Sequence, residues 1–334
     1  MEYTASKQRY DEMKYNKCGE SGLKLPAVSL GLWHNFSACD NYENMKRMCF
    51  TAFDGGITHF DVANNYGRPV MGSAEVNLGK ILREHMKAYR DELIISTKAG
   101  YYMWEGPYGS MGSRKSLLSS LDQSLTRMGL DYVDIFYHHC PDPDTPLEET
   151  MGALDHAVKS GKALYAGISN YDGERMTRAA HILREMKCPF VINQNRYSML
   201  DREIEENGLL NAAIRERKGV IVFSPLAQGV LTDRYLNGIP SDSRIKTSGL
   251  FLTEKSLTDE KMKKVRALKE IANERGETLA QTALAWVLQR DGITGVLIGA
   301  SKPEQIKENI GAISAPEFSA EQLKKIDEIA QKRG

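Results

Sequence analysis

The chain contains THFD at Thr58–Asp61, LIISTK at Leu93–Lys98 and VDIFYHH at Val133–His139. Each run is rich in apolar and β-branched residues, as strands are, and each ends in a polar side chain. One helix-like segment lies in each gap between the runs. Strands that alternate with helices form parallel sheets, and in a parallel barrel the carboxyl ends of the strands share one face. We therefore expect the polar side chains at these three ends to meet.

The alternation continues along most of the chain, and several of the strand-like runs begin just after a turn residue such as Gly or Pro. The expected strands are Ala27–Gly31, Thr58–Asp61, Leu93–Lys98, Val133–His139, Ala163–Ser169, Phe190–Gln194, Val220–Ser224 and Gly295–Ile298. The expected helices are Tyr42–Asp54, Ser73–Arg83, Ser113–Met128, Pro146–Ser160, Gly173–Met186 and Glu205–Arg217. This order predicts an α/β fold, a (β/α)8 TIM barrel.

Three segments lie outside the alternation. A Gly19–Gly22 turn between short apolar-containing runs predicts an N-terminal β-hairpin that closes the barrel floor. Ala99–Gly112 and Ala227–Leu257 are long for connectors, which predicts binding loops or lids at the C-terminal face. No linker stands out, so we expect residues 1–334 to form a single domain with its core at about residues 22–313.

The composition excludes several classes of protein. Lys plus Arg and Asp plus Glu both number 44, so no basic field attracts nucleic acid or anionic lipid. Near-neutral charge favours self-association, and we expect a homo-oligomer, a tetramer or an octamer. No apolar run reaches the ~20 residues of a membrane span. The N-terminus lacks the apolar segment of a signal peptide, and the five cysteines contain no Cys-x-x-Cys spacing, which together predict a reducing cytoplasm.

Asp61, Tyr66, Lys98 and His139 suit the donation of a proton to a carbonyl group that receives a hydride. A free phenol with a pKa of ~10 is a weak acid at neutral pH, and an ammonium such as Lys98 would lower that pKa. Asp61 would hold Lys98 by charge pairing, and His139 could donate a hydrogen bond to the carbonyl oxygen. Taken singly, each residue type is more often a packing or surface residue; their order on consecutive strands favours the catalytic interpretation.

The adjacent His138 and His139 face opposite ways on a strand, so we expect only one of them to enter the barrel. They cannot easily chelate one metal ion, and no metal is expected. A Rossmann Gly-x-Gly-x-x-Gly fingerprint is absent, which disfavours that class of dehydrogenase. A phosphosugar isomerase or aldolase barrel, with Lys98 forming a Schiff base, remains an alternative that the Tyr66–Asp61 partnership disfavours.

Four segments resemble the aldo-keto reductases: HFDVANNYG at His59–Gly67, STK at Ser96–Lys98, LDYVD at Leu130–Asp134 and IGASKPEQ at Ile298–Gln305. The resemblance is strongest to the branch of bacterial L-glyceraldehyde 3-phosphate reductases and potassium-channel β-subunits. It implies NADPH-dependent reduction of small aldehydes, with glyceraldehyde 3-phosphate and methylglyoxal as candidates and Tyr66 as proton donor. It also implies that the reactive histidine is the one just before Cys140, which selects His139 for the barrel and leaves His138 to pack toward helices. An NADPH-binding regulatory subunit with little turnover, like the channel β-subunits, is the alternative.

The resemblance also implies which residues bind NADP. The Gly299–Asn309 segment would hold the adenosine phosphate, with Ser301 as helix N-cap, Pro303 in the first turn and Lys302 beside the 2′-phosphate, which favours NADPH over NADH. The full cofactor set comprises Trp33, Asp61, Ser169, Asn170, Gln194, Phe223, Ser224, Leu226, Arg234, Gly299, Ser301, Lys302, Gln305, Glu308 and Asn309. The candidate substrate residues are Trp33, Arg68, Tyr102 and Trp104, where Arg68 could pair with a substrate phosphate.

Overall fold

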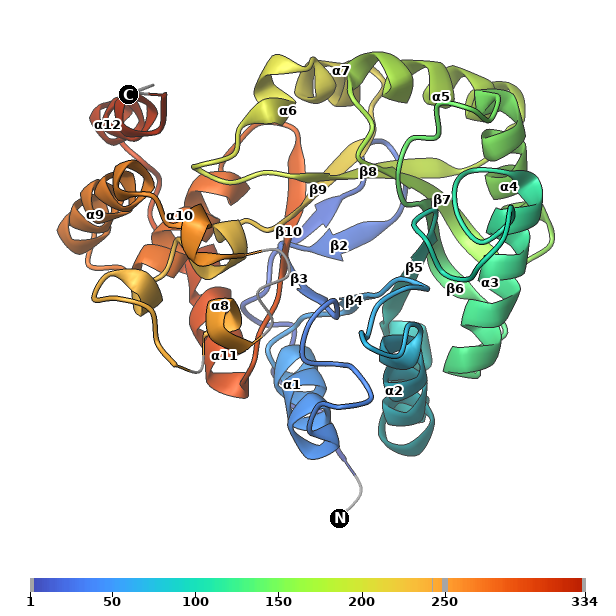
Figure 1. Cartoon of the computed structure of the whole chain (residues 1–334), viewed down its shortest axis with the longest axis horizontal. Helices are drawn as coiled ribbons and strands as arrows, with labels where there is room; N and C mark the ends of the chain where they lie inside the picture. The colour runs from blue at the N-terminus through green and yellow to red at the C-terminus, as the bar shows by residue number, and fades with distance from the viewer. Residues whose placement is uncertain (1–2, 242, 248–251, 332–334) are drawn as a thin grey trace.

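The computed structural model describes residues 3–241, 243–247 and 252–331. Within them, eight parallel strands close into a barrel in the order β10-β3-β4-β5-β6-β7-β8-β9, with helices around it (Figure 1). The strands are β3 Val28–Gly31, β4 His59–Asp61, β5 Ile94–Ala99, β6 Val133–His138, β7 Ala163–Ser169, β8 Phe190–Arg196, β9 Gly219–Phe223 and β10 Ile293–Ile298. The predicted (β/α)8 barrel is confirmed.

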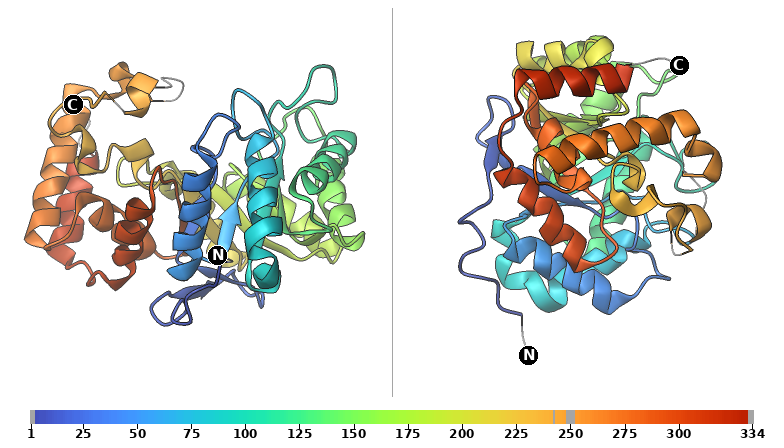
Figure 2. Two further views of the ribbon diagram at one scale, coloured as in Figure 1. Left: turned by 90° about the horizontal axis from the view of Figure 1, so that it is seen from below. Right: turned by 90° about the vertical axis from the view of Figure 1, so that its left-hand side faces the viewer.

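An antiparallel hairpin of β1 (Tyr15–Lys17) and β2 (Lys24–Pro26) closes one end of the barrel. Leu25 lies fully buried in a cluster with the barrel-strand residues Ile135, Tyr137 and Ile221. Figure 2 shows the hairpin at one end of the barrel and the long connecting loops at the other. The predicted hairpin and its position are confirmed, and the open end of the barrel is the one at which the strands finish.

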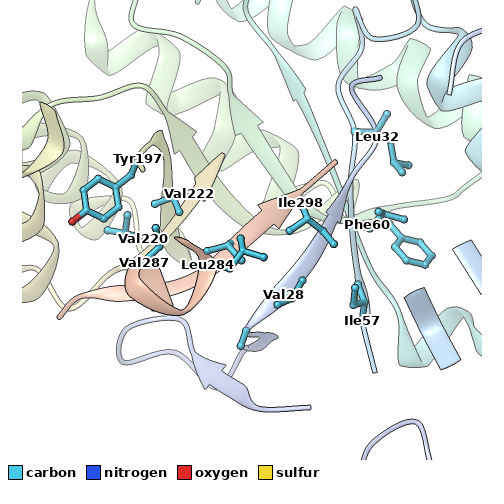
Figure 3. Close-up of a cluster of buried hydrophobic side chains, with 14 of the residues drawn as sticks. Val28, Leu32, Ile57, Phe60, Tyr197, Val220, Val222, Leu284, Val287 and Ile298 are labelled. Carbon is cyan, nitrogen blue, oxygen red and sulfur yellow. The ribbon is translucent and has the colours of Figure 1, made fainter. Parts of the chain in front are cut away.

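The longer helices pack their apolar faces against the outside of the barrel. Figure 3 shows Leu284 and Val287 of the tenth α-helix beside Val28, Val222 and Ile298 of the strands, and all five side chains are fully buried or nearly so. The α-helices are α1 Tyr42–Asp54, α2 Ser73–Ile81, α3 Arg114–Met128, α4 Leu147–Lys159, α5 Gly173–Glu185, α6 Glu203–Glu206, α7 Leu209–Arg215, α8 Arg244–Thr247, α9 Asp259–Glu274, α10 Leu279–Leu288, α11 Pro303–Ile310 and α12 Ala320–Gln331. Short π or 3-10 helices are η1 Leu82–Met86, η2 Lys87–Glu92, η3 Ala227–Gly229, η4 Asp233–Tyr235, η5 Glu254–Ser256 and η6 Gly311–Ser314. Among the helices of the described residues, none is long and apolar enough to cross a membrane.

The predicted helix at Glu205–Arg217 is wrong, because the chain forms α6 and α7 with a break between them. Gly208 at the break has a φ of 77°, a left-handed conformation that glycine adopts without steric cost. The predicted helix at Ser73–Arg83 ends as α-helix at Ile81 and continues as the π-helical η1.

Three helices near the C-terminus, α9, α10 and α12, were not assigned from the sequence. The first two carry N-terminal signals that could have revealed them: the Thr258 side chain accepts from the Lys261 N–H, and Thr278 forms a capping box with Gln281. The predicted loop at Ala227–Leu257 contains η3, η4, α8 and η5, and its residues 242 and 248–251 lie outside the described residues.

Candidate active site

Lys98 is fully buried near the end of β5, and its ammonium group lies against the end of β4. Its Nζ donates to Asp61 Oδ2 at 2.5 Å, to the Val62 carbonyl oxygen at 2.9 Å and to Tyr66 Oη at 3.3 Å. These acceptors match the three donors of an ammonium. Burial lowers the pKa of Lys98, but Asp61 and Tyr66 together outweigh it and leave that pKa raised. Lys98 is therefore charged at neutral pH.

Tyr66 is half-buried in the loop after β4, and its hydroxyl oxygen accepts from Lys98. That bond leaves the Tyr66 O–H available as a donor. Burial raises the pKa of the phenol, and Lys98 lowers it only in part, so the net pKa is raised. The sequence-based expectation of a lowered pKa is wrong for this structure, because desolvation of the phenolate outweighs the attraction of the ammonium. Tyr66 consequently retains its proton at neutral pH.

His139 follows β6, and its backbone N–H donates to the Ala99 carbonyl oxygen at 2.8 Å. Its ring lies 5.9 Å from the Tyr66 ring, centroid to centroid. Burial lowers the pKa of His139 well below the usual value, and the Lys98 charge adds to this effect. His139 is thus neutral at neutral pH and carries one N–H donor. The His138 side chain points the other way, as predicted for neighbouring residues on a strand, and its Nδ1 lies 2.7 Å from Tyr171 Oη.

The structure brings together three side chains of the expected cofactor set, Ser169, Asn170 and Gln194. Ser169 and Gln194 lie at neighbouring positions on β7 and β8, and Ser169 Oγ donates to the Gln194 carbonyl oxygen at 2.8 Å. Asn170 Nδ2 donates to the His139 carbonyl oxygen at 2.9 Å. Gln194 Nε2 donates to Asp61 Oδ1 at 3.2 Å. The amide-bearing residues therefore adjoin the Lys98 cluster.

The segment after β9 has an unusual backbone. Ser224, Ala227 and Gln228 all have left-handed φ angles, of 55°, 46° and 61°. Such angles cost about 1–3 kcal/mol each in residues other than glycine and cluster at ligand-binding sites. Phe223 and Leu226 of the same segment are half-buried, so both retain exposed surface for a ligand.

The segment after β10 exposes the start of α11. Gly299 has open space where a Cβ atom would stand, and Ser301 and Lys302 are exposed. Ser301 was expected to cap α11, but the N-cap residue is Lys302, and Ser301 Oγ instead donates to Gln305 Oε1 at 3.1 Å. Helix N-termini bind anions through their free N–H groups, so this end fits a phosphate group. Pro303 occupies the first helical turn as predicted.

The remaining predicted residues have different degrees of exposure. Arg68 and Tyr102 are exposed, whereas Trp33 and Trp104 are half-buried. The Trp33 ring lies 6.4 Å from the Tyr66 ring. In the cofactor set, Glu308 is exposed, Asn309 is buried and Arg234 is half-buried.

Tyr101 belongs to the Ala99–Gly112 segment that was predicted to form a binding loop or lid, and its ring lies 4.6 Å from the ring of His139 in an edge-on arrangement. It is 45% exposed, so it can form part of the outer wall of the site. Among the described residues, no group of three or more His, Cys, Asp or Glu side chains could hold a metal ion.

Comparison with known proteins identifies the family. Residues 27–331 match the model of the aldo/keto reductase family. The chain belongs to this family. As an aldo/keto reductase it is an oxidoreductase, and members of the family generally use nicotinamide cofactors, typically NADPH.

Two of the relatives of this aldo/keto reductase align over nearly their whole length. The chain is 55% identical over 331 residues to L-glyceraldehyde 3-phosphate reductase of Escherichia coli K12. This alignment covers 98% of the chain and 95% of the relative. The chain is 35% identical over 326 residues to a probable voltage-gated potassium channel subunit beta of Arabidopsis thaliana. This alignment covers 96% of the chain and 98% of the relative.

Proposed function

We propose that this aldo/keto reductase uses NADPH to reduce small aldehydes to alcohols, with glyceraldehyde 3-phosphate and methylglyoxal as candidate substrates. The proposal is carried by one observation: the buried Lys98 ammonium bonds both Asp61 and the Tyr66 hydroxyl, with the neutral His139 nearby. The similarity to L-glyceraldehyde 3-phosphate reductase supports the choice of substrate. When bound, NADPH would supply the hydride to the carbonyl carbon.

The side chains would act on the carbonyl oxygen. The N–H of the neutral His139 ring donates to that oxygen and orients it. Tyr66 then transfers its O–H proton to the same oxygen as negative charge develops there. Lys98 stabilises the phenolate that remains, and Asp61 keeps Lys98 in place. Trp33, Tyr102 and Trp104 would line the substrate, and the exposed Arg68 would meet its phosphate.

Three parts of the chain would hold NADP. Ser169, Asn170 and Gln194 would bind the nicotinamide carboxamide. Phe223, Ser224 and Leu226 would support the ring, and Arg234 would reach the pyrophosphate. Gly299, Ser301, Lys302, Gln305, Glu308 and Asn309 would hold the adenosine phosphate at the start of α11. The left-handed backbone after β9 and the exposed start of α11 support this assignment.

The decisive test is the Tyr66→Phe variant, assayed against a panel of aldehydes with NADPH and with NADH. Loss of a positioned acid lowers kcat by at least ~100-fold. The dissociation constant for NADPH, measured by fluorescence titration, should stay unchanged, because the lost hydroxyl contacts the carbonyl group and not the cofactor's adenosine. Aldehyde turnover at the unsubstituted rate would show that Tyr66 is not the proton donor.

The similarity to a potassium-channel subunit favours a second candidate, a regulatory NADPH-binding subunit with little turnover. The same aldehyde panel separates the two. NADPH binding without oxidation of NADPH by any reactive aldehyde would favour the regulatory subunit. For either function we propose a cytoplasmic homo-oligomer, and the formal net charge of zero supports self-association.

A further inference from the structure

Behind Asp61 lies a line of hydrogen bonds that the proposed chemistry does not use. Ser96 Oγ donates to Asp61 Oδ1 at 2.6 Å. His59 Nε2 is 2.9 Å from Ser96 Oγ, and His59 Nδ1 is 3.0 Å from Ser29 Oγ. Ser29, His59 and Ser96 are completely buried. The line therefore joins three adjacent strands, β3, β4 and β5, inside the barrel.

The protons along this line have one consistent arrangement. The Asp61 carboxylate can only accept, so the Ser96 hydroxyl donates to it. The Ser96 oxygen then accepts the N–H of His59 Nε2, which leaves His59 Nδ1 to accept from the Ser29 hydroxyl. His59 is neutral in this arrangement. Consistently, burial lowers the pKa of His59 to about 4, with Asp61 opposing and Lys98 assisting.

We propose that His59 and Ser96 are positioning residues that fix the Asp61 carboxylate, so that its Oδ2 faces Lys98 and sets the proton affinity of Tyr66. This rests on the proposed role of Tyr66 as proton donor. Gln194 is the other donor to Asp61 Oδ1, at 3.2 Å. Because Gln194 is also assigned to the nicotinamide carboxamide, Ser96 would keep its bond to Asp61 Oδ1 when Gln194 turns to the cofactor.

The remaining ionisable groups around Asp61 do not disturb this arrangement. Tyr137 of β6 is buried within electrostatic range of Asp61, and burial raises the pKa of its phenol well above the usual value. Tyr137 is therefore uncharged across the pH range of an assay. Lys98 and Asp61 are thus the charges that face His59, and Ser96 transmits the orientation of His59 to Asp61.

The neighbouring residue on β5 offers a matched control. Thr97 Oγ1 donates to Glu75 Oε1 at 2.6 Å, the same length as the Ser96 bond, but on the helix-facing side of the strand. Ser96→Ala and Thr97→Val each remove one buried hydroxyl that bonds a carboxylate. Glu75 keeps its ion pair with Arg127 at 2.7 Å, so Thr97→Val tests the structural cost alone.

The experiment compares kcat, KM and the pH dependence of aldehyde reduction in both variants. We expect Ser96→Ala to lower kcat roughly tenfold with little change in KM, the effect of losing one hydrogen bond to a charged group. Without the Ser96 donor, the negative charge of Asp61 is more concentrated and raises the pKa of Tyr66. In Ser96→Ala the midpoint of the alkaline limb of the kcat–pH profile should therefore rise by at least about 0.5 pH unit. Thr97→Val should leave both kcat and this midpoint unchanged.

If Ser96→Ala has the same kcat and the same alkaline midpoint as the unsubstituted protein, the proposal is overturned, whatever the loss of stability. If Ser96→Ala fails to fold, His59→Gln and His59→Leu decide the matter, because Gln keeps one donor and one acceptor and Leu has neither. We expect His59→Gln to retain more kcat than His59→Leu, and identical values in the two would overturn the proposal. Full activity in Tyr66→Phe would instead refute the proposed function itself.

Discussion

Replacement of Lys98 by Met should damage stability and catalysis together, and a second substitution should separate the two. Met has a similar length but no charge, so Lys98→Met leaves the Asp61 carboxylate, 2% exposed, without its cation. Removing one partner of a buried ion pair costs about 3–5 kcal/mol of folding free energy. Tyr66 loses the ammonium that offsets its burial, so its proton becomes harder to transfer.

The double variant Asp61→Asn with Lys98→Met removes both charges. Because no uncompensated charge then remains in the barrel, it should recover about 1–4 kcal/mol of the loss. Its activity should stay at least ~100-fold below that of the unsubstituted protein, since Tyr66 still lacks its ammonium neighbour. Between the single and the double variant, stability is therefore expected to recover while activity stays low.

Chemical denaturation at pH 7 and one fixed protein concentration gives the free energy of unfolding, and NADPH-dependent aldehyde reduction gives kcat. A single variant as stable as the unsubstituted protein would refute the argument that the pair is electrostatically coupled. A double variant less stable than Lys98→Met would refute it equally.

Three other predictions concern packing, pH and the cofactor. In Gly79→Ala the new Cβ would lie 2.4 Å from the Met128 backbone, so the free energy of unfolding should fall by about 1–3 kcal/mol. In Gly152→Ala the nearest atom would be Met186 Cε at 3.9 Å, an ordinary contact, so the free energy of unfolding should rise by up to about 1 kcal/mol; denaturation of both variants checks this. Burial lowers the pKa of His138 from 6.5 to about 4, so between these pH values the unfolded chain binds more protons than the folded chain, and the free energy of unfolding falls as pH drops. In His138→Asn the free energy of unfolding should fall less steeply over this range, by about 1.4 kcal/mol per pH unit. A slope unchanged by the substitution would show that His138 is not the group responsible. Lys302→Met should weaken NADPH binding by about 1–3 kcal/mol and NADH binding little, as measured by fluorescence titration; equal losses would show that Lys302 does not meet the 2′-phosphate.

Much of the fold and the order of the site residues could be predicted from local sequence patterns. Strand-like runs, turn residues and helix-like gaps repeat along the chain, and each can be recognised within a few residues. Since parallel strands end on one face, Asp61, Lys98 and His139 could be grouped before any contact was known. The side-chain period of a strand predicted that His138 and His139 point in opposite directions, and the family resemblance selected His139 for the site.

The tertiary structure decided what depends on burial and on contacts between distant segments. The direction of the Tyr66 pKa depends on how far the folded chain buries the phenol, which no local pattern records. The bond from Ser96 to Asp61 joins residues 35 positions apart and depends on the register of β4 against β5. Tyr101 likewise meets His139 only because the loop after β5 folds over the end of β6. Sequence patterns place each strand to within a residue or two, whereas barrel closure determines which side chains share the interior and how strongly they change one another's proton affinity.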